Sequence, residues 1–152
     1  MRILLTGASG MLGTAVSSEL HHLGHEVVAT ELRGDDKNVQ CLDIRNWEVV
    51  RRHLRECEPE IVFHLAAETD VDRCELEPDH AYATNALGTE NVAWACRELG
   101  CIMVYISTAN VFDGEKIEPY TEYDAPGSLN VYGKSKLEGE RSVTEILDRY
   151  FI

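Results

Sequence analysis

The sequence predicts an α/β fold with a doubly wound parallel sheet, and two observations support this class. Along the 152 residues, short apolar runs alternate with longer stretches of helical period, which is the pattern of a parallel sheet covered by helices. The run at residues 101–106 is apolar without interruption, as expected of a strand that is buried on both faces. A chain of this length fits one domain, residues 1–152.

The elements are expected to alternate in order along the chain. Strands are expected at residues 3–5, 27–29, 39–42, 61–63 and 101–106. Helices are expected at about 12–23, 47–57, 79–99 and 131–149, where apolar side chains recur every three or four residues. Gly24, Pro59 and Gly100 end the first three helices. Residues 113–130 read as a loop and 150–152 as the start of a further strand, so we expect the chain to be truncated before a C-terminal substrate-binding part.

Composition and charge exclude several classes of protein. Apolar residues make up 44% and charged residues 27% of the chain, as in soluble globular proteins, and no apolar run approaches the roughly 20 residues that span a bilayer. The formal net charge of −13 disfavours binding to nucleic acid or to anionic membranes. We therefore expect a cytoplasmic protein with neither of these partners.

The cysteines and histidines give no sign of a metal site or a disulfide framework. The five cysteines are odd in number and contain no Cys-x-x-Cys pair, which is typical of reduced thiols in a cytoplasmic protein. His21, His22 and His25 lack a carboxylate or thiolate at ligand spacing. No metal is expected.

A glycine-rich turn directly follows the first expected strand. Gly7, Gly10 and Gly13 have the spacing G-x-x-G-x-x-G between that strand and the first helix. Such glycines allow a tight turn, a close approach of the backbone to a pyrophosphate, and close packing of helix on strand. The helix N-terminus would then present its amides to the phosphates. A plain turn is the alternative, but this placement indicates a Rossmann-type dinucleotide site.

Glu31 lies at the end of the second expected strand, where an acid commonly binds the adenosine ribose. A carboxylate would repel a 2′-phosphate, so Glu31 favours NAD over NADP. Arg33, two residues on, could weaken that preference, and either residue could instead be a solvated loop charge. The expected cofactor is NAD or NADP, with NAD slightly favoured.

Tyr132 and Lys136 form a Tyr-x-x-x-Lys pair at the start of the last expected helix. Their i, i+4 spacing puts the phenol and the ammonium on one helical face. A nearby ammonium favours the phenolate, which makes a tyrosine a usable general acid or base. Ser107 and Thr108 follow the fifth strand at the edge where open α/β sheets bind ligands; the alternative for both is strand-end capping.

These motifs together resemble the extended short-chain dehydrogenase/reductase superfamily. The matching segments, in the superfamily's order and spacing, are the glycine turn, Asp43-Ile44, His64-Leu65-Ala66-Ala67, Asn85 to Asn91, Ser107-Thr108 and Tyr132 to Lys136. The resemblance implies that Thr108, Tyr132 and Lys136 are catalytic, and that Asp43 and Ile44 bind the adenine. The full set of expected cofactor-binding residues is Gly7, Gly10, Met11, Leu12, Gly13, Glu31, Asp43, Ile44, Ala66, Ala67, Thr69, Asn85, Ser107, Tyr132 and Lys136.

Within this superfamily the chain is most similar to the dTDP-4-dehydrorhamnose reductase family, through residues 111–114, 119–122 and 129–140. That resemblance implies an oxidoreductase that reduces the C4 keto group of a nucleotide-linked 4-keto-6-deoxy sugar, and a homodimer is conceivable. Ala109 departs from the family, which usually carries Asp there. An NAD-dependent sugar-nucleotide epimerase or dehydratase, and a non-catalytic subunit like the regulatory subunit of methionine adenosyltransferase, therefore stay open. We expect this length of chain to bind dinucleotide weakly and to turn over slowly.

Overall fold

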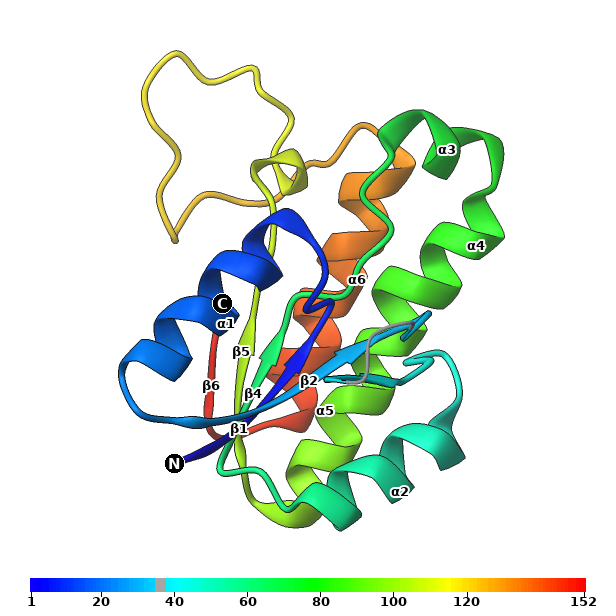
Figure 1. The fold of residues 1–152 in the computed structure, drawn as a ribbon. Helices are drawn as coiled ribbons and strands as arrows, with labels where there is room; N and C mark the ends of the chain where they lie inside the picture. The colour runs from blue at the N-terminus through cyan, green and yellow to red at the C-terminus, as the bar shows by residue number, and fades with distance from the viewer. Residues whose placement is uncertain (35–37) are drawn as a thin grey trace.

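The computed structural model describes residues 1–34 and 38–152 and confirms the Rossmann-type doubly wound sheet. In the described residues, six parallel strands lie in the order β3-β2-β1-β4-β5-β6 (Figure 1). This order reverses direction between β1 and β4, and ligands of open α/β sheets bind outside the carboxyl ends of the strands at such a point. The strands are β1 (Arg2–Thr6), β2 (Glu26–Glu31), β3 (Val39–Cys41), β4 (Ile61–His64), β5 (Ile102–Tyr105) and β6 (Tyr150–Phe151).

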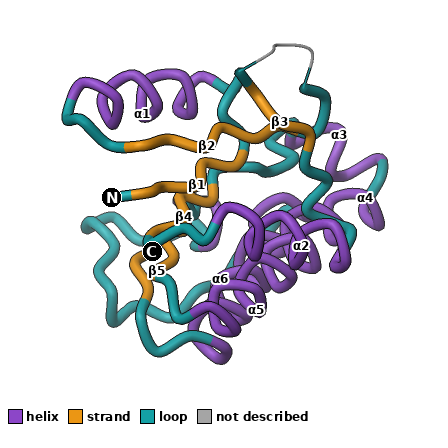
Figure 2. The backbone as a smooth tube through the Cα atoms, turned by 60° about the horizontal axis from the view of Figure 1, so that its bottom comes forward, coloured by secondary structure: helices purple, strands orange, loops and turns teal. Residues whose placement is uncertain are grey.

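Helices lie on both faces of the sheet, as Figure 2 shows. Helix α1 (Met11–His22) packs on β1 and β2 from one side. The opposite side carries α2 (Trp47–Cys57), α5 (Gly88–Leu99) and α6 (Val131–Ile146). None of the helices among the described residues is long and apolar enough to cross a membrane.

The hydrophobic core lies between the sheet and these three helices. Leu4, Val62 and Met103 project from successive strands and are fully buried. They pack in one cluster with Leu54 of α2 and Val143 of α6. The alternation of strand side chains therefore supplies one face of the core, and the apolar stripes of the helices supply the other.

The segment between β4 and α5 differs from the expectation. A short helix, α3 (Val71–Leu76), follows β4 and was not predicted, because six residues are too few to show a helical period. The expected helix 79–99 is in fact three consecutive pieces: α4 (Pro78–Tyr82), the π-helical turn η1 (Ala83–Leu87) and α5. Segments of this kind occur frequently at functional sites.

The last helix is shorter than predicted, and a small turn precedes the long loop. Helix α6 ends at Ile146 instead of residue 149, because Leu147 is extended and leads the chain into β6. The expected strand start at 150 is confirmed, since Tyr150 pairs with Met103 of β5. The 3-10 turn η2 (Ala109–Val111) lies between β5 and the loop.

Candidate functional site

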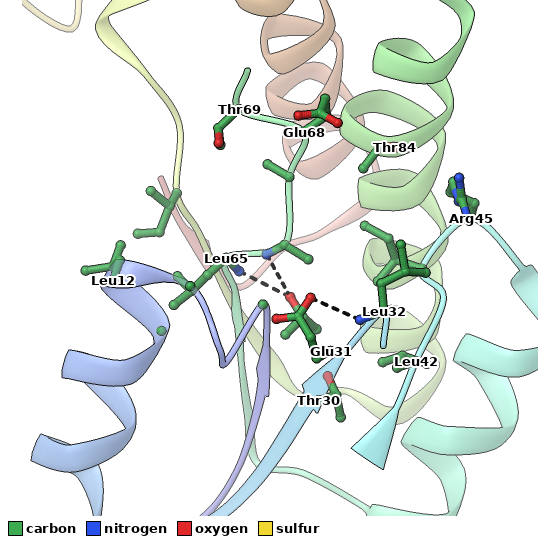
Figure 3. A pocket seen from close by; sticks show the side chains of 18 of the residues that line it. Leu12, Thr30, Glu31, Leu32, Leu42, Arg45, Leu65, Glu68, Thr69 and Thr84 are labelled. Atoms are coloured by element: carbon green, nitrogen blue, oxygen red, sulfur yellow. Dashed lines mark hydrogen bonds between the residues drawn. The ribbon is translucent and has the colours of Figure 1, made fainter. Parts of the chain in front are cut away.

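A cavity of about 750 Å³ opens at the carboxyl ends of β1, β2, β4 and β5 (Figure 3). It lies where the strand order reverses, as the fold predicts. Fourteen of the residues predicted from the sequence line it together: Gly7, Gly10, Met11, Leu12, Gly13, Glu31, Asp43, Ile44, Ala66, Ala67, Thr69, Ser107, Tyr132 and Lys136.

The glycine turn has the geometry that its spacing predicts. Gly7 has a φ of +69°, and a Cβ there would be 2.8 Å from the backbone N of Ala66. A Cβ on Gly13 would collide with the carbonyl oxygen of Gly7. Gly10 is the N-cap residue of the 12-residue helix α1 and brings no side chain to its first turn. The first amides of α1 are therefore left for another acceptor at the cavity.

The carboxylate of Glu31 is fixed over the glycine turn by two backbone amides. Its Oε2 accepts a hydrogen bond from the amide of Ser9 at 3.2 Å, and its Oε1 accepts one from the amide of Leu32 at 3.0 Å. Arg33 also lines the cavity. The two charges that the sequence placed at the end of β2 therefore lie together in the same wall.

Asp43 is at the cavity, but its carboxylate is already engaged. The guanidinium of Arg45 donates to both of its oxygens, at 2.8 and 2.7 Å. These hydrogen bonds from Arg45 lower the pKa of Asp43 and raise that of Arg45. The neighbouring Ile44 is buried and presses against Gly88 of α5. Arg45 was not predicted, although a cation two residues after an acid is a readable signal.

Tyr132, Lys136 and Ser107 line the same cavity as the glycine turn. Asn130 caps the N-terminus of α6 by accepting a hydrogen bond from the amide of Gly133 at 2.7 Å, and so fixes the first turn. The Nζ of Lys136 donates to the carbonyl oxygen of Ile106 at 2.6 Å and lies 4.0 Å from the centre of the Tyr105 ring. Burial lowers the pKa of Lys136 to about 7, against the favourable charge of Glu140.

A chain of buried hydrogen bonds lies beneath the cavity floor. The hydroxyl oxygen of Thr6 accepts from the amides of Leu65 and Ala66, both at 3.2 Å. Its proton is therefore directed to Nδ1 of His64, at 2.8 Å. The Nε2 of His64 is 3.1 Å from the hydroxyl of Thr89, so the ring proton is on Nε2. Burial lowers the pKa of His64 to about 3, helped by the charge of Lys136, and keeps the ring neutral.

Two predicted residues lie away from the cavity lining. Thr108 is half-buried, and its hydroxyl oxygen accepts from the amide of Asn110 at 3.2 Å, which is the capping role left open above. Asn85 is fully buried in η1. Its side-chain oxygen accepts from the amide of Glu68, and its side-chain nitrogen donates to the carbonyl oxygen of Glu68 and to the hydroxyl of Ser135. Asn85 therefore supports the cavity wall from behind.

One charged cluster at the cavity was not anticipated. The carboxylate of Glu68 accepts from Arg73 at 2.9 Å and lies 3.2 Å from Nε2 of His80, and all three residues line the cavity. They come together only because α3 and α4 fold back over the end of β4, which no pattern in the sequence predicts. Among residues 1–34 and 38–152, no group of three or more His, Cys, Asp or Glu is placed to hold a metal ion.

Sequence comparisons identify the relatives of this chain. The family described as the RmlD substrate binding domain matches residues 1–152. The dTDP-4-dehydrorhamnose reductase of Escherichia coli (strain K12) is 37% identical over 152 residues, which are 100% of this chain and 50% of that protein. The methionine adenosyltransferase 2 subunit beta of Rattus norvegicus is 37% identical over 144 residues, 95% of this chain and 43% of that protein. The chain thus spans about half the length of these relatives.

Solved structures share the same fold over the same half. A dTDP-4-dehydrorhamnose reductase from Clostridium acetobutylicum matches with a TM-score of 0.92 and 41% identity, over 99% of this chain and 51% of that chain. The corresponding reductase from Bacillus anthracis, in complex with NADP, matches with a TM-score of 0.89 and 39% identity over 99% and 51%. A UDP-glucose 4-epimerase from Thermus thermophilus, in complex with NAD, has a TM-score of 0.87 and 29% identity over 95% and 50%.

The resemblance found in the sequence motifs is thus confirmed by a match along the whole chain and by close structural similarity. This chain belongs to the RmlD substrate binding domain family.

Proposed function

We propose that this chain forms the cofactor-binding and proton-donating half of a reductase for the C4 keto group of a nucleotide-linked 4-keto-6-deoxy sugar. One observation carries the proposal: Tyr132, Lys136 and Ser107 line the same cavity as the glycine turn. A dinucleotide site and a proton donor are thus within one enclosure. The relatives named as dTDP-4-dehydrorhamnose reductases support the choice of substrate class.

The residues present fit a nicotinamide dinucleotide. The backbone around Gly7 and Gly13 is too close to its neighbours for a Cβ, and the first turn of α1 has no side-chain cap. These features suit a pyrophosphate at the helix N-terminus. Ile44 and Leu42 offer an apolar wall for the adenine, and Lys136 lies deeper, where it would hold the nicotinamide ribose.

A bound reduced nicotinamide would supply the hydride to the carbonyl carbon. The hydroxyl of Tyr132 would donate its proton to the carbonyl oxygen as negative charge grows there. Lys136 is held by the carbonyl of Ile106 and by the Tyr105 ring, so its ammonium stays beside the reacting groups. The Thr108 hydroxyl accepts one hydrogen bond from the amide of Asn110 and lies beside the cavity instead of lining it, so the proposed proton transfer rests on Tyr132 and Lys136.

The Tyr132→Phe variant tests this assignment. We expect it to bind NADH like the wild-type chain but to lose about 100-fold or more in rate, because the general acid is missing. The measurement is the fall in absorbance at 340 nm as NADH or NADPH is oxidised. The protein is in excess over a dTDP-4-keto-6-deoxy sugar. Tyr123→Phe, at a side chain that is 97% exposed, is the matched control. Equal rates for Tyr132→Phe and the wild-type chain would contradict the role of Tyr132.

We further propose that the cofactor is NAD rather than NADP, because Glu31 holds a fixed negative charge over the glycine turn. Isothermal titration should give a dissociation constant for NADH about 10-fold below that for NADPH. In Glu31→Gln the difference should shrink, since the repulsion of the 2′-phosphate is gone while the amide still accepts from Ser9. Tighter binding of NADPH by the wild-type chain would instead mean that Arg33, and not Glu31, determines the cofactor preference.

A second candidate function has its own support: a dinucleotide-binding regulatory subunit. Thr108 serves as a cap beside the site instead of lining it, and the rat methionine adenosyltransferase subunit is as similar to this chain as the E. coli reductase is. This function predicts dinucleotide binding without turnover, together with co-elution with a methionine adenosyltransferase catalytic subunit in size-exclusion chromatography. An epimerase or dehydratase would instead retain tightly bound NAD⁺ after purification, which would become visible at 340 nm once it is reduced by borohydride.

A further inference from the structure

Two side chains of α6 hold two consecutive residues at the end of β5. Lys136 donates to the carbonyl oxygen of Ile106 at 2.6 Å, and one helical turn later Glu140 accepts a short hydrogen bond from the hydroxyl of Ser107. Residues four apart lie on one face of a helix, so the two contacts form a double attachment of helix to strand. Lys136 belongs to the Tyr-x-x-x-Lys pair, whereas Glu140 ends the family-like segment 129–140 and was given no role from the sequence.

Helix α6 approaches Tyr105 of β5 closely at Gly139. A Cβ on Gly139 would collide with the hydroxyl of Tyr105 and lie 2.7 Å from the carbonyl oxygen of Asn85. The hydroxyl of Tyr105 donates to the carbonyl oxygen of Lys136 at 3.1 Å. The helix backbone on either side of Lys136 and Glu140 is thereby held against Tyr105 of β5.

The titratable groups around Lys136 come from three elements. On α6 itself these are Tyr132 and Glu140. Tyr105 of β5 lies under the ammonium with its ring, and His64 of β4, which stacks on that ring at 5.8 Å, is neutral because burial depresses its pKa. Glu140 therefore supplies the negative charge among the groups that act on Lys136.

We propose that Glu140 is a positioning residue of this site: its carboxylate orients the Ser107 hydroxyl and balances the charge of the buried Lys136 ammonium. Glu140 does not line the cavity and acts on the reacting groups through these two neighbours. Burial lowers the pKa of Lys136 to about 7, and Glu140 opposes that fall. Without its charge, more of Lys136 would be neutral at pH 7, and a smaller fraction of the molecules would keep an ammonium in the cavity wall that holds Tyr132.

The direct test is the titration of Lys136 in the full chain, followed by NMR of lysine labelled with ¹³C at Cε and assigned with Lys136→Arg. In Glu140→Gln, which keeps a hydrogen-bond acceptor but removes the charge, the protonated fraction of Lys136 at pH 7 should fall by about three-fold or more. Glu138→Gln removes the same charge from the same helix at an exposed side chain paired with Arg141, and should leave the titration unchanged. Glu140→Asp should restore much of the effect.

The catalytic consequence of Glu140 rests on the proposed reductase function and is measured separately. With NADH and the keto sugar, Glu140→Gln should lower kcat at pH 7 with little change in KM, and the loss of activity at rising pH should begin at lower pH. Ser107→Ala, which keeps the charge but removes the hydroxyl, should lower kcat without moving that pH midpoint.

The two possible failures can be told apart. If Lys136 titrates identically in the wild-type chain, Glu140→Gln and Glu138→Gln, the positioning role of Glu140 is wrong whatever the chain catalyses. If the titration moves as expected but the wild-type chain reduces no sugar nucleotide, the proposed reductase function fails while Glu140 still balances Lys136.

Discussion

His64 shows at the scale of one residue how the fold controls protonation below the site. Its ring lies in a chain of hydrogen bonds from Thr6 to Thr89. The Thr6 hydroxyl donates to Nδ1, Nε2–H donates to the Thr89 oxygen, and the Thr89 hydroxyl donates to the carbonyl oxygen of Asn85. The Thr6 oxygen also orients the amides of Leu65 and Ala66 at the cavity. A charged His64 would have no partner for a second ring proton, and burial without a partner is costly.

Acid should therefore destabilise the chain through His64. Its folded pKa of about 3 lies below the unfolded value of 6.5, so the unfolded state binds more protons between these two values. The contribution of His64 to the free energy of unfolding is fully present above pH 6.5. It falls by up to about 1.4 kcal/mol per pH unit on acidification toward pH 3. Urea unfolding at pH 7 and pH 5 measures this loss, which should be smaller in His64→Gln. His22→Gln, at an exposed site, should lose as much stability as the wild-type chain.

Helix α6 is the element that brings the site together. Its first turn carries Tyr132 and its second carries Lys136, while Glu140 follows one turn later. The orientation of all three depends on where the helix begins. That point is set by Asn130, whose side chain accepts from the amide of Gly133.

Removing this cap should weaken both the fold and the site. Asn130→Ala should cost about 1 kcal/mol in the free energy of unfolding, because the helix loses its N-terminal acceptor. The same variant should reduce the rate more than dinucleotide binding, since Tyr132 lies in the frayed turn and the glycine turn does not. Chemical denaturation and titration with NADH measure the two effects. Asn130→Asp should recover most of the stability, and an Asn130→Ala chain as stable as the wild type would show that other contacts define the helix start.

The elements that could be predicted from sequence are those with long or strongly marked patterns. Gly24 and Gly100 follow helices that end within two residues of them, because both adopt left-handed backbone at the turn. The π-helical turn at 83–87 could not be predicted, since side-chain periodicity does not distinguish it from a continuing α-helix. The partners of Glu68 depend on how α3 and α4 fold over β4. Glu140 lies in the family-like segment 129–140, but its contact with Ser107 depends on how α6 packs on the end of β5. Helix ends and local motifs could thus be predicted from the sequence, whereas contacts between side chains of different elements could not.

At the scale of the whole molecule, the sheet is most buried at its middle and most exposed at one edge. Strand β1 lies between β2 and β4 with Leu4 and Leu5 fully buried. Strand β6 is a two-residue strand at the edge of the described sheet, and Phe151 is 65% exposed. The cavity opens at the ends of β1, β2, β4 and β5, so the site lies on the well-buried part of the sheet.

Amide hydrogen exchange should reflect this gradient. The amides of Leu4 and Leu5 should exchange slowest, near the rate set by global unfolding, and the amide of Phe151 should exchange fastest among the strands. NMR after transfer to D₂O measures both. Protection of Phe151 equal to that of Leu5 would mean that the sheet opens as one unit.

The central position of β1 also bears on how the chain is made. The ribosome makes β1 well before its neighbour β4, which begins only at Ile61, and the wall with Tyr132 and Lys136 comes later still. The glycine turn therefore leaves the exit tunnel long before the groups it works with. A nascent chain must hold the buried residues of β1 without a full set of partners until β4 has been made, so slowing translation between β1 and β4 should lengthen its need for a chaperone.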